Sequence, residues 1–123
     1  ALHPLLTDFP LGCWTSASLL DLIGGRSARP AAQRLVGLGL LGTVPTVLSG
    51  LVEFDGIDSQ SDRRVATAHA IGNSVASGCQ VMSWRARRRD RHLRGAVWTF
   101  AGNGVVALAG YLGGHLLSAV QAK

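Results

Sequence analysis

The stretch that decides the fold is LVGLGLLGTVPTVLSGLV, residues 35–52, which carries no charged side chain. At 1.5 Å per residue, a helix of this length covers about 27 Å of the roughly 30 Å of hydrocarbon in a bilayer. Glycine and proline are also more frequent in transmembrane helices than in soluble ones. The segment therefore predicts a membrane-spanning helix, loosened or kinked in its middle by Pro45.

Two further apolar runs follow along the chain. Residues 65–84 carry no Asp, Glu, Lys or Arg and include His69, and residues 95–120 likewise carry none and include His115 and Tyr111. Each run is long enough to cross the hydrocarbon as a helix. Both predict transmembrane segments.

The segment before the decisive stretch is less apolar. Residues 4–23 carry Asp8 and Asp21 near their two ends, while the middle, FPLGCWTSASLL, is apolar or small, with Pro10 inside it. With short connections, four such segments become antiparallel neighbours. We therefore expect an all-α fold: one integral membrane domain over residues 1–123, built as a four-helix up-down-up-down bundle with spans at about residues 4–23, 33–53, 64–85 and 95–119.

Composition agrees with this expectation. The chain is 47% hydrophobic and 15% charged, with 16 glycines against an ordinary usage of roughly 7%. Small residues let helices in a membrane approach closely. They recur on the third segment at every fourth position and less regularly on the fourth segment, which predicts helix contacts at Ala66, Ala70, Ser74 and Gly78, and at Gly102, Gly110 and Gly114.

The net charge of +5 is unevenly placed. The first and third connections carry nine of the twelve basic residues against Asp90 alone. By the positive-inside rule they lie in the cytoplasm, with residues 53–64 and both termini outside a plasma (inner) membrane. The arginines then contact anionic lipid rather than nucleic acid. Asp21, near the same face, is expected to pair with Arg34 or Arg85.

Histidine and acidic side chains gather near the predicted outer face. Counted by helical rise, Asp8, His69 and His115 fall in nearly one layer, with His3 just above it. Ionisable groups inside a span are costly and mark ion or cofactor sites. The set predicts a transition metal ion held by His69, His115, Asp8 and His3, or a haem b held by His69 and His115 with Tyr111 and Asn73 beside it.

A structural role for the same residues is the alternative. A histidine near a helix end often bonds a carbonyl or a carboxylate, and we favour this for His3. Polar residues inside a bundle commonly hydrogen-bond between helices, which is the expectation for Asn73, Gln80 and Asn103.

Four segments carry a family resemblance: LHPLLTDFPLGCW, SGLVEFD, RRVATAHAIGN and YLGGHLL. Together they resemble a bacterial four-helix membrane domain of unknown function, which in actinobacteria is often joined on its C-terminal side to a Rieske-type ferredoxin domain. The resemblance implies a module associated with electron transfer, with His3, His69 and His115 as its histidines. Many members carry a histidine where this chain has Asp8, so a site that needs a fourth imidazole is in doubt.

Three functions remain open, and an electron-transfer or anchoring subunit is expected rather than an enzyme. The first is a redox module that exchanges electrons with an iron–sulfur (Rieske-type) domain, respiratory complex subunits or a quinone. The second is a non-enzymatic membrane anchor or accessory subunit. The third, a proton path or small transporter, would need a continuous polar line through the bundle.

Overall fold

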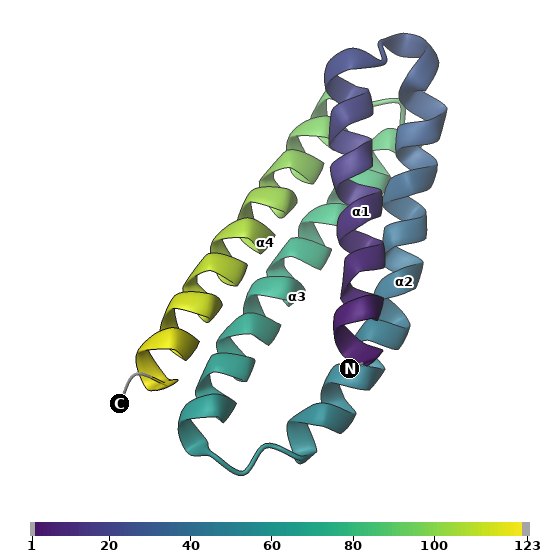
Figure 1. Cartoon of the computed structure of the whole chain (residues 1–123). Coiled ribbons are helices and arrows are strands. Elements are labelled where there is room, and N and C mark those ends of the chain that lie inside the picture. Colours follow the sequence, from purple (N-terminus) through teal and green to yellow (C-terminus); the bar gives the residue numbers. More distant parts are fainter. Residues whose placement is uncertain (1, 122–123) are drawn as a thin grey trace.

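The computed structural model describes residues 2–121, without the side chains of residues 2–5, 53, 112, 113 and 115–121. Its elements are α1 (Leu2–Ile23), a short 3-10 helix η1 (Arg26–Ala28), α2 (Arg29–Asp55), α3 (Gln60–Arg88) and α4 (His92–Gln121). Successive helices run antiparallel (Figure 1). The predicted all-α, up-down-up-down four-helix bundle is confirmed.

The helices α2, α3 and α4 extend into segments that the sequence predicted to be connections. The α2 helix begins at Arg29, α3 ends at Arg88 and α4 begins at His92, so the basic connections shrink to residues 24–28 and 89–91. Ser59 caps α3, its side chain accepting a hydrogen bond from the backbone N–H of Asp62 at 3.3 Å. At the end of the bundle that holds connections 24–28 and 89–91, arginine side chains therefore lie on helical turns, where the fold can orient them.

The four helices pack as two pairs. Contacts of α1 with α2 and of α3 with α4 are far more extensive than contacts between the pairs. The pairs meet beside connections 24–28 and 89–91 and diverge toward the end that holds connection 56–59 (Figure 1). We call residues 10–42 and 76–103 the closed half, and the remainder the open half. All described buried residues lie in the closed half.

The seam between α3 and α4 is built from small and polar residues. On α3 the buried positions Ala76, Gln80, Ser83 and Arg87 alternate spacings of four and three residues. On α4 a Cβ added at Gly102 would lie 2.5 Å from Gln80 Nε2. Only a glycine permits this approach.

The predicted four-residue stripe is not this seam. Ala70, Ser74 and Gly78 are exposed, and Ala66 is half-buried. Steps of four residues drift by about 40° each around a helix of 3.6 residues per turn, so such a stripe leaves a straight interface. On α4, a Cβ at Gly110 or Gly114 would meet no atom within 4 Å.

Pro10 frees a backbone carbonyl inside α1, and α2 supplies its partner. Proline has no N–H, so the carbonyl of Leu6 lacks its donor four residues on. The hydroxyl of Thr46 lies 2.9 Å from that oxygen and also 2.9 Å from the carbonyl of Gly42. A hydrogen bond between helices therefore satisfies the carbonyl that this proline leaves without a donor.

The outer surface of the bundle is apolar. On α2, Leu41 is 70% exposed and Val52 74%; on α3, Ile71 is 61% exposed. Among the described residues, one segment, Arg26–Val52, is long and apolar enough by itself to cross a membrane, and 11% of its most apolar window is buried. The hydrophobic residues of this chain mostly face outward.

Candidate functional site

An ion pair lies inside the closed half. The side chain of Arg87 is fully buried and that of Asp21 is 13% exposed. The guanidinium donates from Nη1 to Asp21 Oδ1 at 2.8 Å and from Nη2 to Asp21 Oδ2 at 2.5 Å. This two-point geometry is the strongest form of an arginine–carboxylate contact. It joins α3 to α1 across the two helix pairs.

Hydroxyl and amide groups extend the ion pair along the seam. Arg87 Nε donates to Ser83 Oγ at 3.0 Å, and Ser83 Oγ lies 2.6 Å from Thr99 Oγ1. Gln80 Nε2 donates to the carbonyl of Thr99 at 3.2 Å. Gln80 Oε1 is buried without a partner among the groups that the structure describes. We name Asp21, Arg87, Ser83, Thr99 and Gln80 the polar core.

Asn103 ties α4 to α1 one turn beyond the polar core. Its Nδ2 donates to the carbonyl of Trp14 at 3.1 Å and to Ser18 Oγ at 2.8 Å. Hydrogen bonding between helices, predicted for Gln80 and Asn103, is therefore confirmed.

The predicted pairing of Asp21 with an arginine is confirmed, but the two arginines named as candidates, Arg34 and Arg85, were wrong. Both of these arginines are exposed, and Asp21 pairs with Arg87 instead. On α3 the side chain of Arg85 points away from Asp21, because Arg85 lies about 200° around the helix from Arg87.

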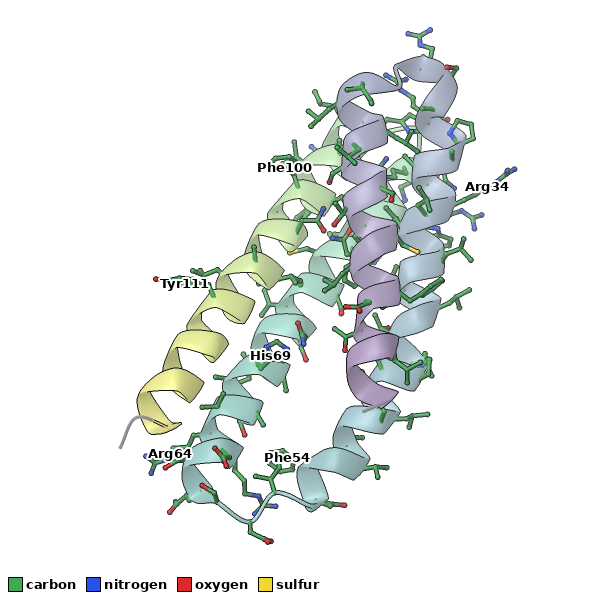
Figure 2. All side chains as sticks on the ribbon, in the orientation of Figure 1. Arg34, Phe54, Arg64, His69, Phe100 and Tyr111 are labelled. Atoms are coloured by element: carbon green, nitrogen blue, oxygen red, sulfur yellow. The ribbon has the colours of Figure 1, made fainter. Side chains whose placement is uncertain are left out.

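His69 continues the polar face of α3 into the open half. Its separation from Arg87 along α3 is about five full turns, so both side chains leave the helix in the same direction. Asn73, one turn closer to the core, is half-buried like His69. His69 lies in the half where the helix pairs diverge (Figure 2). The polar positions 69, 73, 80, 83 and 87 thus form one stripe, interrupted by Ala76.

The other predicted site residues are placed differently. Asp8 is exposed. Tyr111 is 70% exposed, and its ring points away from the other helices (Figure 2). The side chains of His3 and His115 lie outside the described residues. Within the described part of the chain, no group of three or more His, Cys, Asp or Glu residues could hold a metal ion.

Close packing of α3 on α4 limits where a ligand of His69 would lie. A Cβ added at Gly72, one turn from His69, would stand 2.5 Å from Ala109 Cβ. A flat macrocycle does not fit between two helices at this distance. A group bound to His69 would instead occupy the side of α3 that faces the α1–α2 pair, as Arg87 does in the closed half.

A hollow of about 390 Å³ lies between α1 and α4 in the closed half. Leu19, Leu22 and Phe100 are its apolar walls, and each is exposed. Ser18 and Asn103 add polar groups to its lining. Mostly apolar hollows with a few convergent polar groups are typical of small-molecule sites.

Sequence reasoning did not identify Arg87 as a buried residue. The signal was present in the alternating spacing of polar residues on the third segment, which ends on Arg87 in the same register. Because Arg87 stands in a run of arginines, it was interpreted as a charge that faces water or lipid, and the regular spacing was overlooked.

Comparison with known proteins identifies one family. A family described as a predicted membrane protein, DUF2231, matches residues 1–122. No curated protein and no solved structure matches the chain.

Proposed function

Because the chain belongs to the DUF2231 family of predicted membrane proteins, we propose that its four helices cross a bilayer together and serve an electron-transfer assembly. One observation supports membrane embedding above all: the distribution of polarity is inverted. Arg87, Gln80 and Thr99 are at most 1% exposed, whereas Leu41 and Val52 are at least 70% exposed. A soluble bundle buries its apolar residues and exposes its charges.

The modest hydropathy of α3 fits the same proposal. Its polar residues lie on the buried stripe, while exposed positions include Ile71, Val75, Val81 and Met82. Hydropathy averaged around this helix therefore understates how apolar its outward face is. In the assembled bundle, lipid would contact mainly that face.

Orientation follows from the charges at the two ends. We place the arginine-rich connections in the cytoplasm, and connection 56–59 and both termini outside the plasma (inner) membrane. Single cysteines introduced by Arg89→Cys and Asp58→Cys, in a chain lacking Cys13 and Cys79, test this topology. A membrane-impermeant maleimide added to intact cells is expected to label position 58 and not position 89. Labelling of both positions would contradict it.

We further propose that the open half holds a haem b or a transition metal ion through His69, on the side of α3 that faces the α1–α2 pair, with His115 or His3 completing the ligands. The support is the position of His69, whose side chain shares the inward direction of Arg87 and is half-buried although the helix pairs diverge at this level. When bound, either group would carry single electrons within an apolar bundle. Asn73, one turn away, is a hydrogen-bond partner for the imidazole or its ligand.

An absorption spectrum and a metal analysis of the purified protein test the cofactor. A Soret band or near-stoichiometric metal is expected, and His69→Ala is expected to lose it. His92→Ala is the matched control, because His92 is half-buried at the opposite end of the bundle beside Asp90. A colourless preparation without stoichiometric metal, after growth with iron and haem precursor, would contradict the proposal.

A Rieske-type iron–sulfur domain, respiratory complex subunits or a quinone are the proposed redox partners. A quinone ring would match the hollow between α1 and α4, where Phe100 and Leu19 offer apolar contact and Ser18 adds a hydroxyl group to the lining. Its test is quenching of tryptophan fluorescence on titration with a short-chain quinone analogue. Phe100→Ala is expected to weaken that quenching.

A non-enzymatic anchor or accessory subunit is the second candidate. It is favoured by the exposure of Asp8, a predicted ligand, and of Tyr111, predicted to lie beside the cofactor, because neither side chain is in the bundle interior. In this case, replacing His69 and His115 together would leave the activity of a co-purifying partner intact. A loss of that activity in the double variant would exclude the purely anchoring role.

A further inference from the structure

The buried positions of α1 and α3 share one register, which the ion pair sets. Asp21 and Arg87 are 66 residues apart in the sequence. Three further pairs of positions have the same separation, and both members of each pair are buried: Ala17 with Ser83, Trp14 with Gln80, and Pro10 with Ala76. The steps between successive pairs alternate between four and three residues, which keeps the positions on one face of each helix. Because α1 and α3 run in the same direction (Figure 1), paired positions are expected to lie at matching levels.

Contacts made by α4 agree with these levels. Asn103 donates to the carbonyl of Trp14 on α1 at 3.1 Å. A Cβ added at the neighbouring Gly102 would lie 2.5 Å from Nε2 of Gln80 on α3. Two adjacent residues of α4 therefore reach the two members of one pair.

The register continues into the open half for two more layers. The first layer consists of Thr7 and Asn73, and the second of His3 and His69, again in steps of three and four residues. The side chains of Thr7, Asn73 and His69 are half-buried, and the backbone of His3 lies within α1. Each histidine precedes a member of the ion pair by eighteen residues, which is five full turns. Both histidine positions therefore lie on the helix faces that carry the ion pair.

The position of His115 lies on a different face of its own helix. Thr99 is fully buried in the seam between α3 and α4, and α4 continues as one helix to Gln121. Position 115 follows Thr99 by sixteen residues, which places it about 160° around α4 from the seam. Positions 3 and 69 share a register and position 115 does not join it.

We propose that His3 and His69 are the two protein ligands of the cofactor, and that holding it draws the two helix pairs together in the open half. The inference rests on the proposed cofactor and goes further by choosing the second ligand and assigning a movement. Two imidazoles that share one metal ion must each place a nitrogen at about 2.0–2.1 Å from it. The helix pairs diverge at this level (Figure 1), so binding favours the conformation in which they are closer. The polar core, which joins the pairs at the other end, is the pivot.

Single substitutions test the choice of ligands in protein from cells grown with iron and haem precursor. The bound haem or metal is measured by absorption and metal analysis. His3→Ala and His69→Ala are each expected to lower it about tenfold or more, since even residues that only support a metal ligand contribute roughly 10–100-fold to affinity. His115→Ala, the matched control, is expected to keep it. Loss in His115→Ala with retention in His3→Ala would overturn the pairing while leaving the proposed cofactor in place.

Cross-linking tests the register and the movement. In a chain lacking Cys13 and Cys79, Thr7→Cys with Asn73→Cys places two thiols one layer from the histidines and keeps both of them. A short bifunctional maleimide is expected to join these positions about fivefold or more faster in the loaded protein, the low end of coupling between a ligand and a conformational change. Mass spectrometry of the linked peptides measures the rate. Equal rates in the loaded and unloaded protein would overturn the movement.

The matched control for cross-linking is Thr7→Cys with Ser74→Cys. Ser74 is exposed and lies about 100° around α3 from Asn73, so this pair is expected to react more slowly. Equal rates for the two pairs in unloaded protein would overturn the register. This comparison needs no cofactor, so failure of the proposed cofactor is distinguishable from failure of the histidine pairing. Circular dichroism of each variant checks folding.

Discussion

The closed and open halves of the bundle share one polar stripe but use it differently. In the closed half, Arg87, Ser83 and Gln80 are buried and hydrogen-bonded to α1 or α4. In the open half, His69 and Asn73 continue the stripe where the helix pairs have diverged. The same pattern on one helix therefore fixes helix positions at one end and leaves an imidazole accessible for a ligand at the other.

The largest stability effect is expected from breaking the ion pair. Arg87→Ala leaves Asp21 without its partner inside the bundle, and breaking a buried pair costs about 3–5 kcal/mol. Unfolding by SDS in mixed micelles measures this loss. Arg85→Ala, an exposed arginine on the same helix, is the control and is expected to leave the midpoint unchanged. Asp21→Leu with Arg87→Met should recover most of the stability, since paired apolar residues of similar size often replace a buried ion pair.

The next largest effect is expected at the glycine seam. Gly102→Ala places a methyl group 2.5 Å from Gln80 Nε2 and 3.1 Å from the carbonyl of Ala76, and overpacking of this kind costs about 1–3 kcal/mol. Gly104→Ala, which meets nothing within 4 Å, is the matched control. Equal unfolding midpoints for the two variants would show that α3 and α4 do not pack closely at this level.

A smaller effect tests the proline in α1. Thr46→Val removes the donor to the carbonyl of Leu6, and hydrogen bonds between membrane helices average about 0.6 kcal/mol. Pro10→Ala restores the N–H that this carbonyl lacks. The cost of Thr46→Val is therefore expected to shrink in the Pro10→Ala background, as measured by a double-mutant cycle. Identical costs in both backgrounds would contradict the pairing of Thr46 with Pro10.

The smallest stability effect is expected in the open half. In protein prepared without bound haem or metal ion, His69→Ala should change the free energy of unfolding by no more than about 0.5 kcal/mol, because no buried packing among the described residues depends on it. Thermal unfolding in detergent measures this. A loss as large as that of Arg87→Ala would mean that both halves use the stripe for stability, and would weaken the assignment of His69 to a ligand.

The fold could be predicted from the sequence because three runs without Asp, Glu, Lys or Arg, each as long as a membrane-spanning helix, leave few alternatives. The ends of the helices could be predicted less well. The arginine-rich segment after the third apolar run was interpreted as a connection, yet α3 continues into it as far as Arg88. That extension explains the missed partner of Asp21. Two positions along a helix correspond to a rotation of about 200°, so Arg85 faces outward while Arg87 faces the core.

The candidate site was predicted only in part. Depth along each helix can be counted from sequence, so His69 and Asp8 were placed at similar levels. Direction around each helix depends on which face packs, and small residues at four-residue spacing suggested the wrong face of α3. On α1, Asp8 is exposed. On α3, the side chain of His69 leaves the helix in the same direction as the buried side chains of the polar core.

Burial of Arg87 on α3 has a consequence for biogenesis. A lone α3 would partition poorly from the translocon into lipid, because Gln80 and Ser83 within it would face hydrocarbon without the hydrogen-bond partners that α4 supplies. Arg26–Val52 has no such penalty within its apolar window. We expect that segment to enter the membrane first and α3 to enter afterwards as a hairpin with α4. The charge of Arg87 is then neutralised when its guanidinium reaches the carboxylate of Asp21, which is already in place on α1.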